Sequence, residues 1–170
     1  MLRSLALAAA LVIGANAAYA ANTLPGGGGM TAPAGSAYQS ITKAEITSIL
    51  SSQGYTYEDT TQGGGDPVLR VTAKNGIIFD VFFFGCQSGA CQRLQFKAGW
   101  TMSQAVPLAD LNKYHQDWVF GRVYHLDNNG SPEFWLDMAF IAKGATRQNI
   151  IENLAWWETI STQVRDDFKL

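Results

Sequence analysis

The chain has 170 residues, of which 47% are hydrophobic and 12% aromatic, and its formal net charge at pH 7 is −2. This apolar content excludes a disordered chain, and the length suits one folded domain. The lysines and arginines form no cluster, which argues against a nucleic-acid-binding protein.

Residues 1–20 have the pattern of a secretory signal peptide. Arg3 precedes a mainly apolar run from Leu5 to Ala18, and Ala18-Tyr19-Ala20 fits the small-residue cleavage pattern. A membrane span needs about 20 apolar residues, so we expect no stable membrane insertion after cleavage. We therefore expect cleavage after Ala20 and a mature protein in the periplasm or outside the cell, where thiols oxidise.

Residues 21–40 are expected to form a flexible linker rich in Gly, Ala and Pro. Four consecutive glycines, Gly26–Gly29, precede an uncharged stretch without apolar periodicity. No strand is predicted before the glycines and no Lys-Ser/Thr pair follows them, so a phosphate-binding loop is not favoured. We place a single domain at residues 41–170.

The domain is predicted to begin with a helix from Lys43 to Gln53. Thr42-Lys43-Ala44-Glu45 has the spacing of a capping box, in which the Thr hydroxyl and the Glu carboxylate each accept a hydrogen bond from a free backbone N–H. Ile46, Ile49 and Leu50 follow at helical spacing. These three residues should form the buried face of the helix.

Extended segments are predicted at residues 55–60, 68–73 and 77–84, with a hairpin turn at Lys74-Asn75-Gly76. A two-residue loop would place Asp80 on the apolar face, whereas a three-residue loop with a left-handed Gly76 keeps that face apolar. A slip of one residue moves every side chain to the opposite face, so the pattern favours the three-residue loop.

Cys86 and Cys91 are predicted to lie opposite each other at the ends of the next hairpin, in a register that places Val81 opposite Phe96 and Asp80 opposite Lys97. In an oxidising compartment this arrangement favours a structural disulfide. A redox-active pair is less favoured, because it usually has Cys-x-x-Cys spacing at a helix N-terminus. A zinc site would need two more ligands, and the chain has only two histidines. We expect no metal and no cofactor.

A second helix is predicted to begin at Pro107, which is a favoured first helical position. Its apolar arc would contain five residues: Leu108, Leu111, Tyr114, His115 and Trp118. We interpret His115 as a hydrogen-bonded core histidine rather than a ligand or base. His125 and Asp127 are two residues apart on a predicted strand, a spacing too common to indicate a metal site.

Residues 119–126 and 133–140 are predicted to form a third hairpin around Asn128-Asn129-Gly130. A two-residue loop pairs Arg122 with Asp137 and Tyr124 with Trp135. A three-residue loop instead sets Arg122 beside Leu136 and gives a cleaner apolar core. The sequence leaves both registers open, and the simplest interpretation of Arg122 and Asp137 is a cross-strand ion pair.

The last predicted helix starts near Gly144 and Thr146 and ends at about Phe168. Its buried stripe would comprise Ile150, Leu154, Trp157, Val164 and Phe168, with Trp156 at the edge. The complete order predicts an α+β fold in which an antiparallel sheet of five to six strands is covered on one face by three helices. The other sheet face would be open.

The chain resembles the YbjN family over about Thr42 to Phe168. The resemblance rests on several short motifs in a fixed order: Leu50 with Gly54-Tyr55, Asp80-Val81-Phe82-Phe83 before Cys86 and Cys91, Leu94-Gln95-Phe96, Leu111-Asn112 with Tyr114, Phe120-Gly121-Arg122-Val123-Tyr124, and Leu136-Asp137. It implies a type III secretion chaperone-like fold and a role as a bacterial sensory transduction regulator or chaperone-like protein. It implies no catalytic residues.

No nucleophile, metalloprotease or nucleotide-binding motif is present, so we predict a non-catalytic module that acts outside the cytoplasm through protein–protein contacts. The candidate partner-binding residues are Trp135, Trp156, Arg122, Tyr124 and Asp137. The partner is an unidentified protein, and pairing into a homodimer is a related expectation. The alternative is a small-ligand site in the cleft between the sheet and the helices, with Arg122 holding an anion. A thiol-redox protein is less favoured.

Overall fold

The computed structural model describes residues 35–63 and 65–170. The predicted signal peptide and most of the predicted linker therefore lie outside the described residues. Within the described residues, none of the helices has the length and apolarity that crossing a membrane requires.

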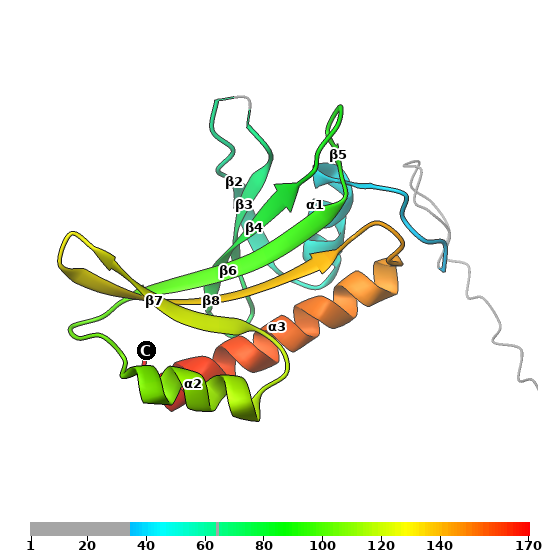
Figure 1. The fold of residues 1–170 in the computed structure, drawn as a ribbon. Coiled ribbons are helices and arrows are strands. Elements are labelled where there is room, and N and C mark those ends of the chain that lie inside the picture. Colours follow the sequence, from blue (N-terminus) through cyan, green and yellow to red (C-terminus); the bar gives the residue numbers. More distant parts are fainter. Residues whose placement is uncertain (1–34, 64) are drawn as a thin grey trace, which may run out of the picture. The chain divides into compact units, whose positions relative to one another are not determined.

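Six antiparallel strands form the main sheet, in the order β2-β3-β4-β6-β8-β7 (Figure 1). Their bounds are β2 Thr56–Asp59, β3 Val68–Thr72, β4 Ile78–Phe84, β6 Arg93–Thr101, β7 Arg122–Asn128 and β8 Ser131–Ile141. The short strands β1 (Ile41–Thr42) and β5 (Ala90–Cys91) pair separately with each other.

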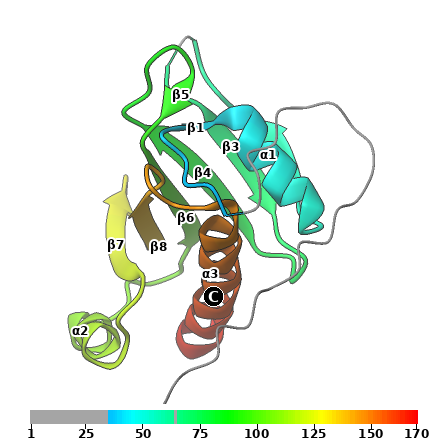
Figure 2. The same ribbon diagram turned by 90° about the vertical axis from the view of Figure 1, so that its right-hand side faces the viewer.

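In the part of the chain that the structure describes, three helices accompany the sheet, as predicted. α1 (Lys43–Ser52) and α3 (Arg147–Phe168) lie over the same face of the sheet, and α2 (Leu108–Asp117) lies beside β7 at the sheet edge (Figure 2). The opposite face carries no helix among the described residues, so the predicted α+β fold with one open sheet face is confirmed.

The folded part begins before the predicted boundary at residue 41. Tyr38 is buried, its N–H donates to the Ala145 carbonyl at 2.8 Å, and Ala37 bridges Thr146. This contact ties the approach to α1 to the start of α3. The predicted linker thus ends earlier, because the Tyr38 side chain is buried in the core, although the sequence around it shows no apolar periodicity.

The predicted hairpin registers are confirmed. Val71 lies opposite Phe79 across a turn in which Gly76 has φ of +81°, and Val81 lies opposite Phe96. The register that the sequence left open has the two-residue loop, with Arg122 opposite Asp137. Both loop residues have positive φ, as the tight hairpin turn that matches strand twist requires.

The pairing of β6 with β8 was not predicted. These strands run side by side over nine residue pairs, from Arg93 opposite Ile141 to Thr101 opposite Glu133. The chain between them includes both α2 and β7, so no local turn signal identifies the pair. The two strands pair because burying their apolar faces together in the core removes those faces from water.

The core centres on Trp157 of α3, which is fully buried. Its ring centroid lies 5.5 Å from that of Phe79 and 5.8 Å from that of Phe96, on adjacent strands. The predicted stripe of α3 is buried except for Phe168, which is only partly covered at the end of the helix. Ile160 and Ser161 are also buried, and Thr146 caps the helix as expected.

α2 differs from its prediction in two ways. Pro107 is the capping residue rather than the first helical residue, and only Leu111 and Tyr114 of the predicted arc are buried. His115 is exposed, although its Nε2 lies 3.0 Å from the Val123 carbonyl oxygen. The core-histidine interpretation is therefore wrong as to burial, because α2 packs at the sheet edge and most of its surface faces solvent.

Candidate binding surfaces

Four of the five predicted partner-binding residues come together on the open sheet face. Arg122 and Tyr124 lie on β7, directly opposite Asp137 and Trp135 on β8. The fifth residue, Trp156, lies apart on α3, which covers the other face. The structure therefore separates the sequence-predicted candidates into two surfaces.

The ion pair between Arg122 and Asp137 is bidentate. The Arg122 Nη2 is 2.6 Å from Asp137 Oδ2, and its Nε is 3.2 Å from Oδ1. This hydrogen bond and the carboxylate charge raise the pKa of Arg122. Asp137 is only 4% exposed although it lies on the open face, since its neighbours cover it.

Arg122 also stacks on Tyr124, with its guanidinium carbon 4.9 Å from the ring centroid. Burial is the main cause that raises the pKa of Tyr124, followed by the nearby Asp137 charge. Because these contacts are on the open face, Arg122 does not line the space between the sheet and the helices. The prediction that it holds an anion there is wrong, since the two-residue hairpin loop points it the other way.

Trp135 lies flat over the neighbouring strand β6. The Lys97 Nζ stands 4.0 Å from the centre of its ring, and the indole N–H donates to Glu133 Oε2 at 3.1 Å. Directly opposite Trp135 is Gly99, where an added Cβ would come within 2.5 Å of the ring. Sequence reasoning missed Gly99. Its only signal was a glycine inside an apolar strand, which often marks close approach.

A second surface, which we call the aromatic patch, comprises Trp118, Val119, Phe120 and Trp156. Val119 is 91% exposed, and Phe120 and Trp156 are each about half exposed. The Phe120 and Trp156 ring centroids are 5.5 Å apart, so the loop before β7 and helix α3 form one apolar surface.

Residues 119–121 were predicted as strand, and this is wrong, since β7 begins at Arg122. The chain turns at Gly121, which has φ of +80°. Its backbone is so close to the core that an added Cβ would lie 3.1 Å from Ile160 and from Leu136. The turn directs Val119 and Phe120 outward. Of this patch, only Trp156 was among the predicted partner-binding residues, and Trp118 had been assigned to the apolar arc of the second helix.

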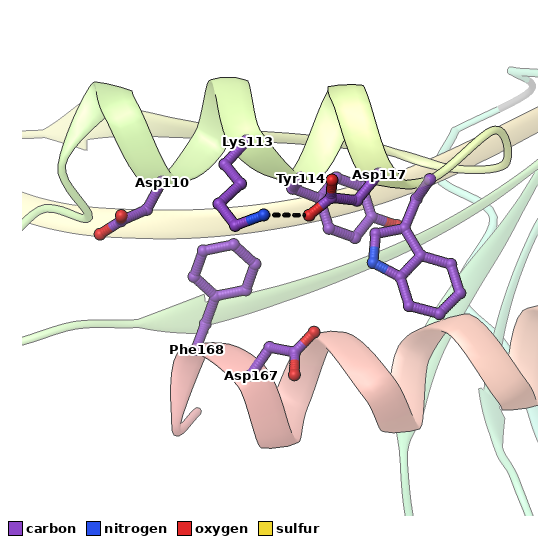
Figure 3. A pocket seen from close by; sticks show the side chains of 7 residues that line it. Asp110, Lys113, Tyr114, Asp117, Asp167 and Phe168 are labelled. Atoms are coloured by element: carbon purple, nitrogen blue, oxygen red, sulfur yellow. Dashed lines mark hydrogen bonds and ion pairs between the residues drawn. The ribbon is translucent and has the colours of Figure 1, made fainter.

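A groove of about 410 Å³ runs between α2 and the C-terminal end of α3 (Figure 3). Aromatic and acidic side chains line it: Tyr114, Trp118 and Phe168, with Asp110, Asp117 and Asp167. Among the described residues that line it, Lys113 is the one cation, and its Nζ bonds Asp117 at 2.6 Å. The net charge of this lining is therefore negative, whereas the predicted anion site would need a positive charge.

Tyr114 at the base of this groove makes unfolding sensitive to alkaline pH. Burial, then the Asp167 charge, raises its pKa from 10.0 to about 12. Between these values the unfolded chain loses the phenol proton and the folded chain keeps it, so the free energy of unfolding falls as pH rises. Stability that is present below pH 10 is lost through pH 12, up to about 3 kcal/mol.

Urea unfolding at pH 9 and at about pH 11.5 measures this effect, and Tyr114→Phe should show a smaller decrease. The variant loses the hydroxyl's hydrogen bond to the Phe120 carbonyl (3.2 Å), so it should be about 1 kcal/mol less stable at neutral pH. Some alkaline sensitivity should remain, because burial also raises the pKa of Tyr55. An unchanged pH dependence in the variant would contradict the assignment.

Cys86 and Cys91 form a disulfide, as expected, across the hairpin that leads into β6. Cys91 is buried and pairs with Ile41 of β1, and this strand pairing connects the hairpin to the segment before α1. Within the part of the chain that the structure describes, no three His, Cys, Asp or Glu side chains gather to hold a metal ion. His125 and Asp127 belong to no such group, and Asp127 instead accepts from the Gly130 N–H at 2.7 Å.

A family model matches residues 42–170, almost the whole described chain. The chain belongs to the YbjN family. The family is described as a "putative bacterial sensory transduction regulator", a description of a regulator rather than an enzyme. A search of curated proteins finds no match. The family match agrees with the resemblance seen in the sequence motifs.

Proposed function

We propose that this YbjN protein is a non-catalytic binding module that works outside the cytoplasm and contacts a protein partner through its aromatic patch. The observation that carries the proposal is the joint exposure of Val119, Phe120 and Trp156. Exposed aromatic side chains that lie together are typical of interaction sites, where Trp residues often contribute most of the binding energy.

The local structure supports a prepared surface rather than accidental exposure. Gly121 holds the loop in a turn that only glycine adopts freely, and Phe120 rests against Trp156 across two elements. Trp118 extends the same surface, stacked with Tyr114 at 6.3 Å. A partner that covers these rings would remove apolar surface from water without a large rearrangement.

Site-specific crosslinking of the full chain tests the proposal. A photoreactive amino acid at Val119 should crosslink one discrete protein in the native extracytoplasmic fraction, whereas the same group at the exposed Glu152 of α3 should not. The purified crosslinked protein should bind the chain saturably, and Trp156→Ala should weaken that binding about 30-fold or more. Equal crosslinking at both positions, or unchanged binding by the variant, would reject the patch.

The compartment is tested separately by the intact mass of the exported protein. Export predicts a mature chain that starts at Ala21 and lacks the mass of the signal peptide. The Cys86–Cys91 disulfide is consistent with an oxidising compartment, where such bonds persist. A full-length chain retained in the cytoplasm would refute the localisation and leave the patch to be judged on its own experiment.

A small-ligand site is the second candidate function, and the groove between α2 and α3 is the observation that favours it. Its carboxylates and aromatic rings suit a cationic ligand rather than the anion first predicted. A panel of amines should raise the melting temperature more than a matched panel of organic acids. A response to neither panel, or to the acids alone, would exclude this candidate.

A further inference from the structure

One row of the open sheet face carries a charge on every strand. The paired positions run across the sheet from β2 to β7 and alternate in sign without a break. In order they are Glu58, Arg70, Asp80, Lys97, Asp137 and Arg122. Two neighbouring pairs, Arg70 with Asp80 and Arg122 with Asp137, are in ion-pair contact.

An alternating row with an even number of charges complements its own reversed copy. If a second sheet packs face to face with its strand order reversed, Glu58 meets the second copy's Arg122, and Asp80 meets the second copy's Lys97. The reversal corresponds to a twofold axis parallel to the strands. A twofold axis along the row would instead set like charges against each other, so electrostatics selects the first arrangement.

Of the charged groups that would meet, Glu58, Arg70 and Arg122 are exposed, Asp80 is partly covered, and Asp137, which would face the second copy's Arg70, is covered. The side chains of Arg122 and Arg70 are 65% and 53% exposed, and Glu58 is exposed on the edge strand. Among the described residues, Lys97 has no carboxylate within 4.0 Å and is held over Trp135 instead. Asp137 is covered by its own neighbours. On β6, β8 and β7 the accessible charges of the row are therefore the two cations, Lys97 and Arg122.

Large apolar side chains flank the row on both sides. Ile78 and Leu126 lie toward one end of the strands, and Phe84 and Ile141 toward the other, and all four are at least 40% exposed. Five strand spacings make the face about 24 Å wide, and nine residues of β6 make it about 30 Å long. Its area of about 700 Å² approaches the 800 Å² that each partner contributes to a stable interface.

We propose that the open face binds a second copy of this chain, in a face-to-face homodimer whose twofold axis runs parallel to the strands and aligns the two charge rows in opposite order. Two sheets packed in this way would be about 10 Å apart, with their strands nearly aligned. The aromatic patch contains residues of α3 and the loop before β7, so this dimer is a proposal independent of the patch.

Analytical ultracentrifugation of the mature chain tests the dimer. At about 100 μM in low salt the protein should be dimeric. Raising the salt to about 0.5 M should increase the dissociation constant at least tenfold, because salt screens the charges of the row. Glu58→Lys should also weaken it at least tenfold, because the new cation meets the second copy's Arg122 twice in each dimer.

The matched control is Glu152→Lys, which makes the same charge change on α3 and should leave the dissociation constant unchanged. Ile78→Ser supplies an uncharged second variant and should also weaken the dimer at least tenfold. A monomeric wild-type chain, equal effects of Glu58→Lys and its control, or a dimer lost only on Trp156→Ala would each overturn the proposal.

Crosslinking tests the direction of the axis. The proposed arrangement places β2 over the second copy's β7, so a short bis-maleimide should join Thr56→Cys of one chain to Leu126→Cys of another in a mixture of the two variants. Neither variant alone should crosslink, because the reversed strand order places the two copies of its cysteine at opposite edges of the packed sheets. Crosslinks formed by either variant alone, without the mixed product, would reject the charge alignment.

Discussion

Replacing Trp157 by alanine should lower the free energy of unfolding by about 3–5 kcal/mol, the cost of deleting a large aromatic side chain from a packed core. Trp157 is fully buried, and it joins α3 to β4 and β6 through Phe79 and Phe96. Alanine would leave a cavity where the helix meets the sheet, and the surrounding structure can close it only in part. Urea unfolding at neutral pH measures the loss.

Two further variants make this prediction specific. Within the described residues the buried Trp157 Nε1 has no hydrogen-bond partner, so Trp157→Phe keeps a ring, removes an unsatisfied donor and should cost less than about half as much as alanine. Trp156→Ala, one residue away, should cost about 1 kcal/mol because that side chain is half exposed and packs mainly on Phe120. Similar losses for both alanine variants would contradict the assignment of one tryptophan to the core and the other to the surface.

Replacing Gly99 by valine should destabilise the protein by about 1–3 kcal/mol, although valine ordinarily favours a strand. An added Cβ at this position would lie 2.5 Å from the Trp135 ring, so the indole would have to leave its place over β6. Its contact with Lys97 and its hydrogen bond to Glu133 would then be lost. The change in urea midpoint measures the effect.

The partner of this clash provides the control. In a Trp135→Ala background the space above Gly99 is free, so Gly99→Val should become neutral or stabilising, because glycine weakens a strand interior. The double-mutant cycle should therefore give a coupling energy of at least 1 kcal/mol. Additive effects would show that the ring does not depend on the missing side chain.

The cysteine hairpin shows how far local sequence reasoning reaches. The register of Val81 opposite Phe96 followed from keeping apolar residues on one face, and the disulfide followed from the same register together with the expectation that the chain is exported. Both depend on residues that are close in sequence, where turn chemistry and alternation carry most of the information. The helix caps at Thr42 and Thr146 were predictable for the same reason.

The candidate surfaces were predictable only in part. Arg122, Tyr124, Trp135 and Asp137 were named together because a two-residue loop pairs them, yet the sequence could not choose that loop over the alternative. Val119 and Phe120 were assigned to a strand, because nothing local shows that Gly121 would meet the core and turn them outward. The charge row is visible only once all six strands are in order.

By itself, therefore, the sequence determined the helices, the hairpins with clear alternation, the disulfide and the family, since each depends on short-range periodicity, capping or motif order. Tertiary structure alone decided the pairing of β6 with β8, the exposure of α2 and the burial of Tyr38. Those features depend on which apolar surfaces, distant in sequence, are buried against one another. That choice depends on the packing of the complete core, which short-range sequence patterns do not contain.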